Sequence, residues 1–571
     1  MFKTRYKSHH DAEHEYRELL PKTPASGAEL TEYLNAQRPV SLRENAIYIH
    51  VPFCERICSF CNMNRKLVDD SLGTYVTDLI KQIRSMGNHH FFKVNEIKAV
   101  YFGGGTPTVL APEAFEEIMT ALRASFLMTQ DCEITCETTL HNLTTDHLTM
   151  FKVLGINRLS IGIQTFQTAG RKFFNRTYDK AEVIKRLTKI RQSFAGCLSI
   201  DKIYNYPGET KEMLLDDVAQ IINLEIDSVS FYSLMIHKGS KLSEELTASD
   251  FSLEQDQHFH DLFIEALRTK GDFEFLELTK MARTGRDRYY YMNIRNGNGN
   301  TIPLGKGAGG QIGPFQIYNV DFDRIMMVRL DDDTNEVANK VYGIFQSPVI
   351  EKAQLEELKL ATALQAELEK LIAKGYLVEH EQAFEMTAKG IFYGNNIGGV
   401  LARKYLEAQP PKKVQNSKMP LVQKAKIEKT IADFVAPFKG GIMATMAKDK
   451  KPQLSTIAVV KKGHTIYTLI SQTAPHYHNL KEHNQAQIIF AEEQADMENA
   501  FVRKRLSYDV TATFIDGEES LLQDFCEQHG AVTKMLCQMG FEFVALKITG
   551  GKIILGPAMA YRFDEDEVVC P

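Results

Sequence analysis

The chain has 571 residues, of which 44% are hydrophobic and 25% charged, and its formal net charge is −6. This size predicts two to four domains, and the negative balance gives no reason to expect nucleic acid as a partner. The chain has no window of about 18 apolar residues and no apolar core near its start, so we expect neither a membrane span nor a secretory signal. We therefore expect a cytoplasmic protein, where a tight group of cysteines indicates metal or redox chemistry.

Short β-rich runs alternate six times with amphipathic helical stretches in the first part of the chain. This alternation predicts an α/β domain with a parallel sheet. The spacing suits a partial (β/α)6 barrel, because six units are too few for the full eight-stranded barrel; a doubly wound open sheet is the competing interpretation. The predicted strands are 46–53, 96–102, 132–138, 157–163, 197–204 and 227–235.

Changes in composition divide the chain further. We expect an N-terminal extension over 1–42, the α/β core over 43–330 and a helical, winged-helix-like region with a short hairpin over 331–406. Residues 407–420 combine two adjacent prolines with polar and basic residues, which indicates a linker. Strands joined by tight turns then predict an antiparallel split β-barrel over 421–571.

Three cysteines, Cys54, Cys58 and Cys61, directly follow the first predicted strand. Thiolates bind zinc and iron–sulfur clusters alike, but a structural zinc site would need a fourth Cys or His, and none is near. A [4Fe–4S] cluster held by three cysteines leaves one iron open for a substrate or cofactor. Zinc and three incidental thiols remain as alternatives.

The run Gly103–Pro107 follows the second strand and allows a ligand to approach the backbone closely, although a tight turn is the simpler interpretation. Further polar residues occur on or after later strands, where the mouth of an α/β barrel builds its sites. Each alone could be structural, but their agreement with the cysteine loop favours one site. They are Glu137, Gln164, Arg176 and Asp201.

The runs "YIHVPFCERICSFC" and "YFGGGTPT" resemble the radical S-adenosylmethionine (SAM) superfamily, in the branch of oxygen-independent coproporphyrinogen III dehydrogenase. "RLSIGIQTF", "NRTY" and "IDKIYNYPGET" occur in that branch's order, and the likeness covers about 43–400. It implies that the three cysteines hold the cluster and that the open iron binds SAM. Reduction of the cluster by one electron would then cleave SAM to methionine and a 5′-deoxyadenosyl radical.

The same resemblance implies roles for individual residues around two SAM molecules. Gly104, Gly105 and Thr106 would meet the amino end of the first SAM, with Tyr48 and Glu137 helping to place it and Phe60 as the aromatic residue of the cysteine motif. A second SAM would be contacted by Gln164, Arg176 and Asp201, and by the backbone of Met235; Arg176 and Asp201 are the catalytic candidates.

Other positions resemble a particular group within this branch. Met63 stands where the dehydrogenase and its haem-chaperone relatives carry a further cysteine, and Asn205 stands where they have glycine. Together with 299–319, these departures resemble the anaerobic haem-degrading methyltransferases (ChuW/HutW family). That family implies opening of the haem macrocycle with methyl transfer from SAM, giving a linear tetrapyrrole and free iron.

The region 430–571 resembles the HutZ/HugZ haem-utilisation proteins, which share the split barrel of the FMN-binding pyridoxamine-phosphate oxidase group. Arg503 and Arg505 suit a phosphate or a haem propionate, or a solvated strand end. His476 and His478 are candidate haem ligands, although a surface position is the simpler interpretation. The ligand histidine expected near the C-terminus is absent: the last one is His529, and the tail offers only Cys570.

We therefore expect an anaerobic, haem-opening radical SAM methyltransferase with a [4Fe–4S] cluster, two SAM molecules and haem as substrate. Coproporphyrinogen dehydrogenation is one alternative, and a haem chaperone or carrier without catalysis is another. A low-potential donor such as flavodoxin or reduced flavin must supply electrons. The C-terminal barrel could bind haem or flavin, hand over substrate or product, or form a homodimer.

Overall fold

The computed structural model describes residues 2–17, 19–20, 22–37, 43–237, 239–247, 252–330, 332–408, 429–492, 503–556, 559–564 and 567–569. The chain divides into two compact units, Met1–Pro410 and Pro411–Pro571. Among the described residues, no helix has the length and apolar character needed to cross a membrane.

Six parallel strands form the centre of the first unit and pair with one another in chain order. A doubly wound sheet would reverse its strand order at a switch point. The sequential order therefore confirms the partial (β/α)6 barrel over the competing interpretation. The strands are β2 (Asn45–Val51), β5 (Ile97–Gly104), β6 (Met128–Thr138), β7 (Arg158–Gln164), β8 (Cys197–Tyr204) and β9 (Ser228–Ser233).

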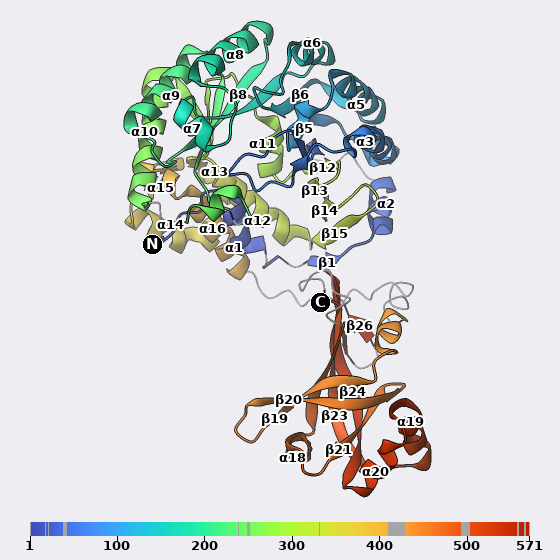
Figure 1. The fold of residues 1–571 in the computed structure, drawn as a ribbon. Coiled ribbons are helices and arrows are strands. Elements are labelled where there is room, and N and C mark those ends of the chain that lie inside the picture. The colour runs from blue at the N-terminus through green and yellow to red at the C-terminus, as the bar shows by residue number, and fades with distance from the viewer. Residues whose placement is uncertain are drawn as a thin grey trace. The chain divides into compact units, whose positions relative to one another are not determined.

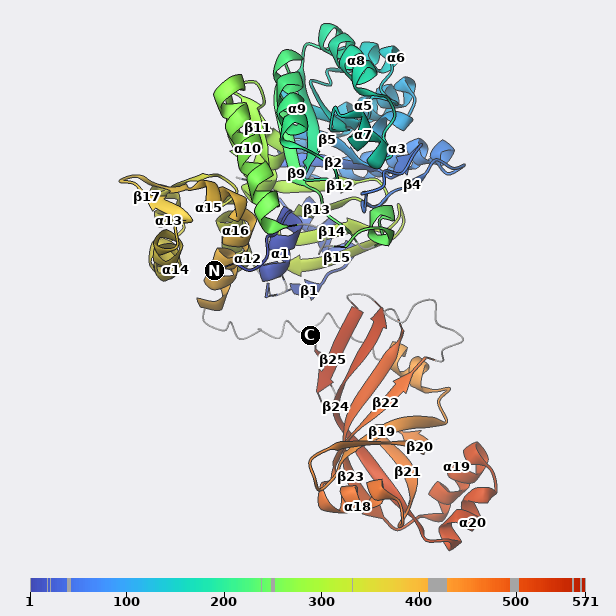
Figure 2. The same cartoon turned by 60° about the vertical axis from the view of Figure 1, so that its left-hand side comes forward.

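The connecting helices lie along the outer face of this curved sheet (Figures 1 and 2). Side chains of Thr144, Asp179 and Thr210 accept hydrogen bonds from free N–H groups at three helix starts, which fixes where those helices begin. Their apolar faces pack on the outward residues of the strands in one large core. The helices are α3 (Leu72–Gly87), α5 (Pro112–Ser125), α6 (Thr145–Leu154), α8 (Lys180–Ser193), α9 (Lys211–Asn223) and α10 (Leu253–Gly271).

Additional strands extend the sheet at both edges, to 13 strands in all. At one edge β12 joins β2 in parallel and continues into an antiparallel meander. These strands lie partly within 299–319, a stretch whose structure we did not predict. The added strands are β12 (Asn300–Leu304), β13 (Gly309–Ile312), β14 (Phe315–Asn319), β15 (Ile325–Leu330) and β1 (Lys22–Pro24) at that edge, and β11 (Lys280–Arg283) and β10 (Phe273–Glu277) at the other.

The predicted N-terminal extension is part of the first unit. It contributes β1 to the sheet, α2 (Gly27–Asn35) to the core and α1 (His9–Arg17), which packs on α16 (Gly394–Ala408). Ahead of α1, Arg5 donates hydrogen bonds to the Tyr204 hydroxyl at 2.9 Å and to the Asp256 carboxylate at 3.1 Å. These hydrogen bonds fix the start of the chain to the carboxyl end of β8 and to the first turn of α10.

The region after β15 contains the helices and the hairpin that the sequence predicts, with an additional strand. Its three-stranded sheet has the order β16-β18-β17, and its helices share a separate apolar core with α1 and α16. The predicted linker lies outside the described residues from 409 onward. The elements are α12 (Asp332–Ile344), β16 (Val349–Glu351), α13 (Lys352–Glu357), α14 (Ala361–Ala373), β17 (Leu377–Glu379), β18 (Ala383–Met386) and α15 (Ala388–Phe392).

The second unit is a closed antiparallel barrel, as the sequence predicts. Six strands pair in the order β21-β20-β19-β22-β23-β24, and β21 also pairs with β24, which closes the ring. The strands alternate buried and exposed side chains around their own core. The elements are β19 (Gly440–Met446), β20 (Pro452–Lys462), β21 (Thr465–Ser471), α18 (Pro475–Glu482), β22 (Gln485–Ala491), β23 (Arg505–Ile515), α19 (Glu519–His529), α20 (Val532–Gln538), β24 (Phe541–Gly556), β25 (Met559–Asp564) and β26 (Glu567–Val569).

A buried ion-pair group fixes the turn between β8 and α9. The Lys202 ammonium lies 2.7 Å from Glu209 and 3.0 Å from Asp217, and all three side chains are nearly inaccessible. Glu209 also accepts the backbone N–H of Asn205, which directly follows β8. Two carboxylates this deeply buried require the cation, because an unpaired buried charge is strongly destabilising.

Replacing Lys202 by Met should lower the free energy of unfolding by about 3–5 kcal/mol, because Glu209 and Asp217 would be left without their cation. Lys180→Met is a matched control, since the Lys180–Asp216 pair is about one-third exposed at each side chain. It should cost less than about 1 kcal/mol. Urea unfolding of both variants checks this, and equal losses would contradict it.

Candidate functional site

One position on each parallel strand lines a partly exposed inner layer. From its midpoint to its carboxyl end, each strand is buried except at one position of intermediate exposure. The outer face of the sheet is covered by helices, so this layer faces the inside of the arc. The positions are Tyr48 (β2), Tyr101 (β5), Glu137 (β6), Gly162 (β7), Asp201 (β8) and Tyr232 (β9).

Tyr48 and Glu137, which were predicted to help place SAM, lie beside the glycine run. The Glu137 carboxylate accepts hydrogen bonds from the Tyr101 hydroxyl at 2.7 Å and from the Gly104 N–H at 3.1 Å. A Cβ at Gly103 would lie 3.0 Å from Glu137 and 3.1 Å from Tyr48, so a larger residue would require these side chains to shift by a few tenths of an ångström. Strands β2, β5 and β6 therefore meet at this corner.

Burial of the Glu137 carboxyl raises its pKa to about 7, and the nearby negative charge of Asp201 adds to this shift. The hydrogen bonds from Tyr101 and Gly104 oppose the shift by stabilising the carboxylate. Near neutral pH this group can hold or release a proton, and its charge responds to any cation placed beside it.

Asp201, a catalytic candidate, faces two buried cations. Burial raises its pKa, while Lys280, Arg158 and Arg176 oppose the increase. Lys280 and Arg158 are themselves held by Asp287, at 3.8 Å and 3.0 Å. The base of the inner layer is therefore a charge network in which Asp201 is the residue that reaches the accessible surface.

The cysteine loop runs between β3 (Phe53–Cys54) and β4 (Lys66–Leu67) and is held from several sides. The Ser59 N–H donates to the Phe174 carbonyl at 3.4 Å, and the Ser59 hydroxyl donates to the Phe173 carbonyl at 2.8 Å, next to α7 (Thr168–Phe173). Ser59 also accepts the Leu242 N–H at 3.0 Å from the 3-10 helix η2 (Lys241–Glu244). These hydrogen bonds from two neighbouring segments fix the conformation of the loop.

The three cysteines are free thiols close enough to influence one another. Burial raises the pKa of Cys54 and of Cys61, and the thiolate of Cys58 adds to both shifts. Thr106, also predicted to contact SAM, donates its hydroxyl to the Cys54 sulfur at 3.5 Å. A positive centre, such as the irons of a cluster, would favour the ionised form of Cys54 and Cys61.

The glycine run passes close to this loop. Gly104 has a φ of +106°, and a Cβ there would lie 2.7 Å from the His50 ring. The N–H groups of Gly105 and Thr106 donate to the carbonyls of Val51 and Phe53 at 2.7 and 2.8 Å. The run is therefore a fixed wall of the cysteine loop rather than an independent turn.

The donor set fits an iron–sulfur cluster better than a single metal ion. In the described part of the chain, no three His, Cys, Asp or Glu side chains converge on one point, as a zinc ion would require. In a four-iron cluster each thiolate binds a different iron, so such convergence is unnecessary. The three partly buried thiols on a pre-formed loop meet that requirement.

Gln164, Arg176 and Phe60 form the other side of the mouth. A Cβ at Gly162 would lie 2.7 Å from a terminal nitrogen of Arg176 and 3.1 Å from the Gln164 amide, so both side chains cover β7. The Arg176 guanidinium lies 5.9 Å from the centre of the Phe60 ring, and its charge also reaches Cys61. Its buried Nε has no partner among the described residues, which leaves a donor for a ligand.

Backbone conformation supports the same assignment at the end of β7. Gln164 has a φ of +69°, a left-handed conformation that non-glycine residues seldom adopt. Such strain concentrates at functional sites. Asn205, which follows β8, has a φ of +59° and occupies the position at which the resemblance expects glycine.

Met235 follows β9 and lines a cavity together with residues from the start of the chain and from α10. Sequence reasoning missed the inward residues Tyr101 and Tyr232, and also Tyr291, whose ring centre lies 4.6 Å from that of Tyr101. Alternation along the strands could have found the first two, because each is in phase with its strand's inward positions.

Candidate residues of the second unit have local partners or face solvent. The Arg503 Nε donates to the Glu492 carbonyl at 2.7 Å, and Arg505 is exposed in β23. His478 is exposed on α18, whereas His476 has a buried Nδ1 without a partner in the described part of the chain. His529 contacts the Val459 carbonyl at 3.1 Å, and Cys570 lies outside the described residues.

The Glu137 assignment gives a pH dependence of stability in the metal-free protein. Because its folded pKa of about 7 exceeds its ordinary value of 4.5, its contribution to stability is complete below about pH 4.5 and is lost as pH rises to about 7. The free energy of unfolding of Glu137→Gln, measured relative to wild type, should therefore rise by up to about 3 kcal/mol as pH increases across this window. Urea unfolding at several pH values measures the difference, and a constant difference would contradict the shifted pKa.

Two family models match the chain, one in each unit. Residues 48–221 match the Radical SAM superfamily, and residues 427–554 match the pyridoxamine 5′-phosphate oxidase family. The first match spans the cysteine loop and the strands that carry Glu137, Gln164 and Asp201. The second match spans most of the closed barrel.

Curated relatives resemble the first unit. An anaerobilin synthase from Escherichia coli O157:H7 is 27% identical over 282 residues, which are 49% of this chain and 63% of that protein. The heme chaperone HemW of Lactococcus lactis subsp. lactis (strain IL1403) is 24% identical over 372 residues, 62% of this chain and 96% of that protein. The chain thus spans less than two thirds of the first relative and nearly all of the second.

Among solved structures, the radical SAM enzyme coproporphyrinogen III oxidase (HemN) from Escherichia coli has a TM-score of 0.58 at 21% identity, covering 67% of this chain and 95% of that one. This likeness confirms the predicted fold. The first unit therefore has the fold of HemN and a segment that matches the Radical SAM superfamily, and the closed barrel of the second unit matches the pyridoxamine 5′-phosphate oxidase family.

Proposed function

We propose that the protein opens the haem macrocycle under anaerobic conditions, with methyl transfer from SAM, giving a linear tetrapyrrole and releasing iron. The observation that carries this proposal is the likeness of the radical SAM unit to an anaerobilin synthase. The departures at Met63 and Asn205 support it, because they separate the chain from the dehydrogenase pattern. We assign the activity to the cytoplasm, where thiols stay reduced.

The cluster would be held by Cys54, Cys58 and Cys61, and together with SAM it would supply a 5′-deoxyadenosyl radical after one-electron reduction. Residues of this chain then bind and orient the reactants. Backbone carbonyls of the run from Gly104 to Thr106 would accept from the amino end of SAM, because the N–H groups of the run already donate within the protein. Tyr48 and Glu137 would lie beside it. Phe60 and the partly buried cysteines would limit the access of water to that position.

A second SAM would lie on the side of Gln164, Arg176 and Asp201. The unpartnered Nε of Arg176 suits a carboxylate, because a guanidinium pairs well with such an anion. The Asp201 carboxylate would accept a hydrogen bond from the second SAM or pair with its positively charged sulfonium or amino group. We retain both residues as the catalytic candidates and Met235 as a weaker backbone contact.

A haem chaperone without catalysis is the second candidate, because the likeness to HemW covers nearly that whole protein. A pure carrier has no need of the charged inner layer around Asp201. Coproporphyrinogen dehydrogenation is the third. We propose that the second unit binds haem, flavin or product, or forms a dimer, and that flavodoxin or reduced flavin supplies electrons.

Replacing Cys54, Cys58 or Cys61 by Ala should remove most of the absorption near ~400 nm that thiolate-ligated iron–sulfur clusters show after reconstitution. Each thiolate holds one iron, so each single variant should lose the cluster. Cys526→Ala in α19 is the matched control, because this thiol is partly exposed in the second unit. Full absorption in all three loop variants would contradict the ligand assignment.

The activity predicts a product that mass spectrometry can identify. Reconstituted protein with SAM, a low-potential reductant and haem should yield 5′-deoxyadenosine and a methylated open tetrapyrrole. Asp201→Asn should lower turnover by about 10²-fold or more, the range found for groups that position or exchange protons in catalysis. Intact porphyrin despite SAM cleavage would favour the carrier, and carbon dioxide release from coproporphyrinogen would favour the dehydrogenase.

A further inference from the structure

One row of paired residues continues the inner layer past Tyr48 and across four further strands. β12 joins β2 with Pro303 beside Tyr48, and the register of β12 with β13 sets Gly309 opposite Pro303. β14 and β15 extend the row in antiparallel pairs. Residues paired across a sheet lie on the same face, so this row faces the inside of the arc as Tyr48 does. The row is Tyr48, Pro303, Gly309, Tyr318 and Met326.

The opposite face of the strands from β12 to β15 belongs to the main core. The Tyr33 ring of α2 lies 5.5 Å from the Phe315 ring of β14, and Figure 1 shows α2 on the outer side of these strands. Alternation of side chains therefore buries one face in the core and turns the other toward the inside of the arc. The core residues of that outer face are Ile302, Leu304, Ile312, Phe315 and Ile317.

The inner face of the same strands is apolar and partly exposed. Tyr318 is 39% and Met326 is 38% exposed, and Val328, two residues after Met326, is partly exposed. Gly309 adds no side chain, although a Cβ there would make only an ordinary contact, 3.7 Å from the Tyr318 ring. The space beside that ring is therefore open. The surface of Pro303, Gly309, Tyr318, Met326 and Val328 is called the inner shelf below.

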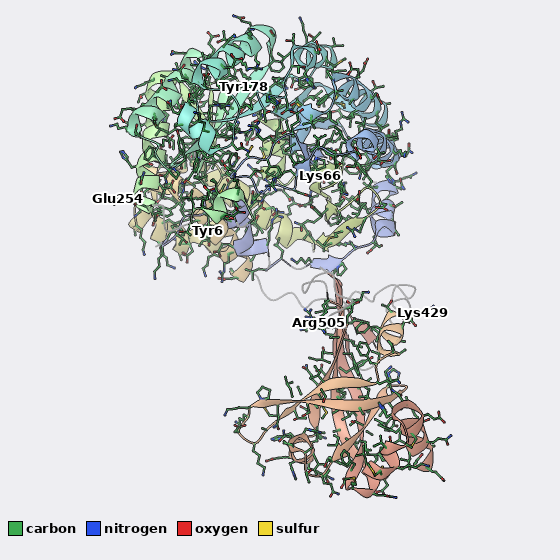
Figure 3. All side chains as sticks on the ribbon, in the orientation of Figure 1. Tyr6, Lys66, Tyr178, Glu254, Lys429 and Arg505 are labelled. Carbon is green, nitrogen blue, oxygen red and sulfur yellow. The ribbon has the colours of Figure 1, made fainter. Side chains whose placement is uncertain are left out.

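The inner shelf borders the cysteine loop at Asn64. The Asn64 amide donates a hydrogen bond to the Tyr318 hydroxyl at 2.9 Å, and the Asn64 carbonyl accepts one from His50 Nε2 at 2.8 Å. Gly307, with a φ of +88°, allows this approach, because a Cβ there would lie 2.5 Å from the Asn64 amide nitrogen. Asn64 lies between the last cysteine of the loop and β4, where Figure 3 labels Lys66. A molecule on the inner shelf would therefore lie against the cysteine loop itself.

Tyr48 connects the inner shelf to the corner at which β2, β5 and β6 meet. The Tyr48 hydroxyl lies 3.0 Å from His50 Nδ1. Because His50 Nε2 donates to the Asn64 carbonyl, Nδ1 accepts the hydrogen bond from Tyr48. Tyr48 is thus held between Glu137, beside the proposed position of the first SAM, and Asn64 at the border of the shelf.

We propose that the inner shelf binds the haem macrocycle, with the ring against Tyr318 and Met326 and one edge toward Tyr48 and the cysteine loop. This inference rests on the proposed function for its choice of ligand. Neighbouring strands lie about 4.8 Å apart, so the row from β2 to β15 extends over about 19 Å of the sheet. A planar apolar ring can lie on such a surface where Gly309 leaves it open, and an aromatic side chain such as Tyr318 stacks on it.

The test uses a fluorescent reporter, because the chain contains no tryptophan. Met326→Trp supplies one on the inner shelf, and bound ferric haem should quench its fluorescence. In this background Gly309→Leu, which fills the open space beside Tyr318, should raise the haem concentration for half-maximal quenching by about tenfold or more. Gly27→Leu, at the start of α2, is the matched control, because a Cβ there meets nothing within 4 Å. It should leave the midpoint unchanged.

The titration uses the full-length, reconstituted protein under anoxic conditions, with SAM and without reductant. Absorption near ~400 nm, recorded before haem is added, shows that the radical SAM unit of each variant is folded and holds its cluster. Met535→Trp, 52% exposed on α20 of the second unit, reports haem bound there, and Gly309→Leu should not change its midpoint. An unchanged midpoint of the Met326→Trp reporter after Gly309→Leu would overturn the assignment.

The outcomes separate the inner shelf from the proposed reaction. If Gly309→Leu weakens haem binding but wild type never opens the macrocycle, the shelf assignment stands and the catalytic proposal fails. If wild type opens the macrocycle and Gly309→Leu binds haem and reacts equally well, the catalytic proposal stands and the shelf assignment is wrong. Unchanged haem affinity together with slower reduction of the cluster by flavodoxin would assign this surface to the electron donor and overturn the haem assignment.

Discussion

In a parallel sheet, slanted backbone hydrogen bonds fix each strand to the next, and here six strands are joined in this way in chain order. Because side chains alternate between faces, the register decides which residue of each strand points inward. A slip of one position would turn Tyr48 and Asp201 toward the helices and bring apolar neighbours such as Ile49 and Ile200 inside. The candidate site exists only in the observed register.

This register buries polar groups, and the surrounding charges determine the free-energy cost of burying them. Asp287 takes the direct ion pair with Arg158, while Asp201 feels the same cations from a greater distance. Asp287 is therefore stabilised as an anion, with its pKa well below the usual range, whereas the pKa of Asp201 remains raised. Asp287 therefore stabilises the fold through its ion pair, whereas the ionisation of Asp201 can respond to a bound ligand.

Much of this could be predicted because the signals are local. The cysteine spacing, the glycine run and the alternation of strands and helices each occupy a short stretch, so the barrel follows from the sequence. The predicted residues include three of the six inner positions, namely Tyr48, Glu137 and Asp201. The pairing of β12 with β2, the placement of Arg5 against Tyr204, and the role of Tyr291 depend on contacts between residues far apart in the chain. No periodicity within one segment reports such contacts.

Met235 illustrates the same limit most clearly. The family resemblance alone implied a backbone contact of Met235 with the second SAM. The strand ends at Ser233, however, and the chain then crosses to Ser59 through Leu242. Leu234 and Ile236 belong to the apolar cluster around Phe60 and also line the cavity with Met235, next to residues of the N-terminal segment. The neighbours of Met235 therefore depend on where the chain turns after β9, and no pattern within 227–235 reports that turn.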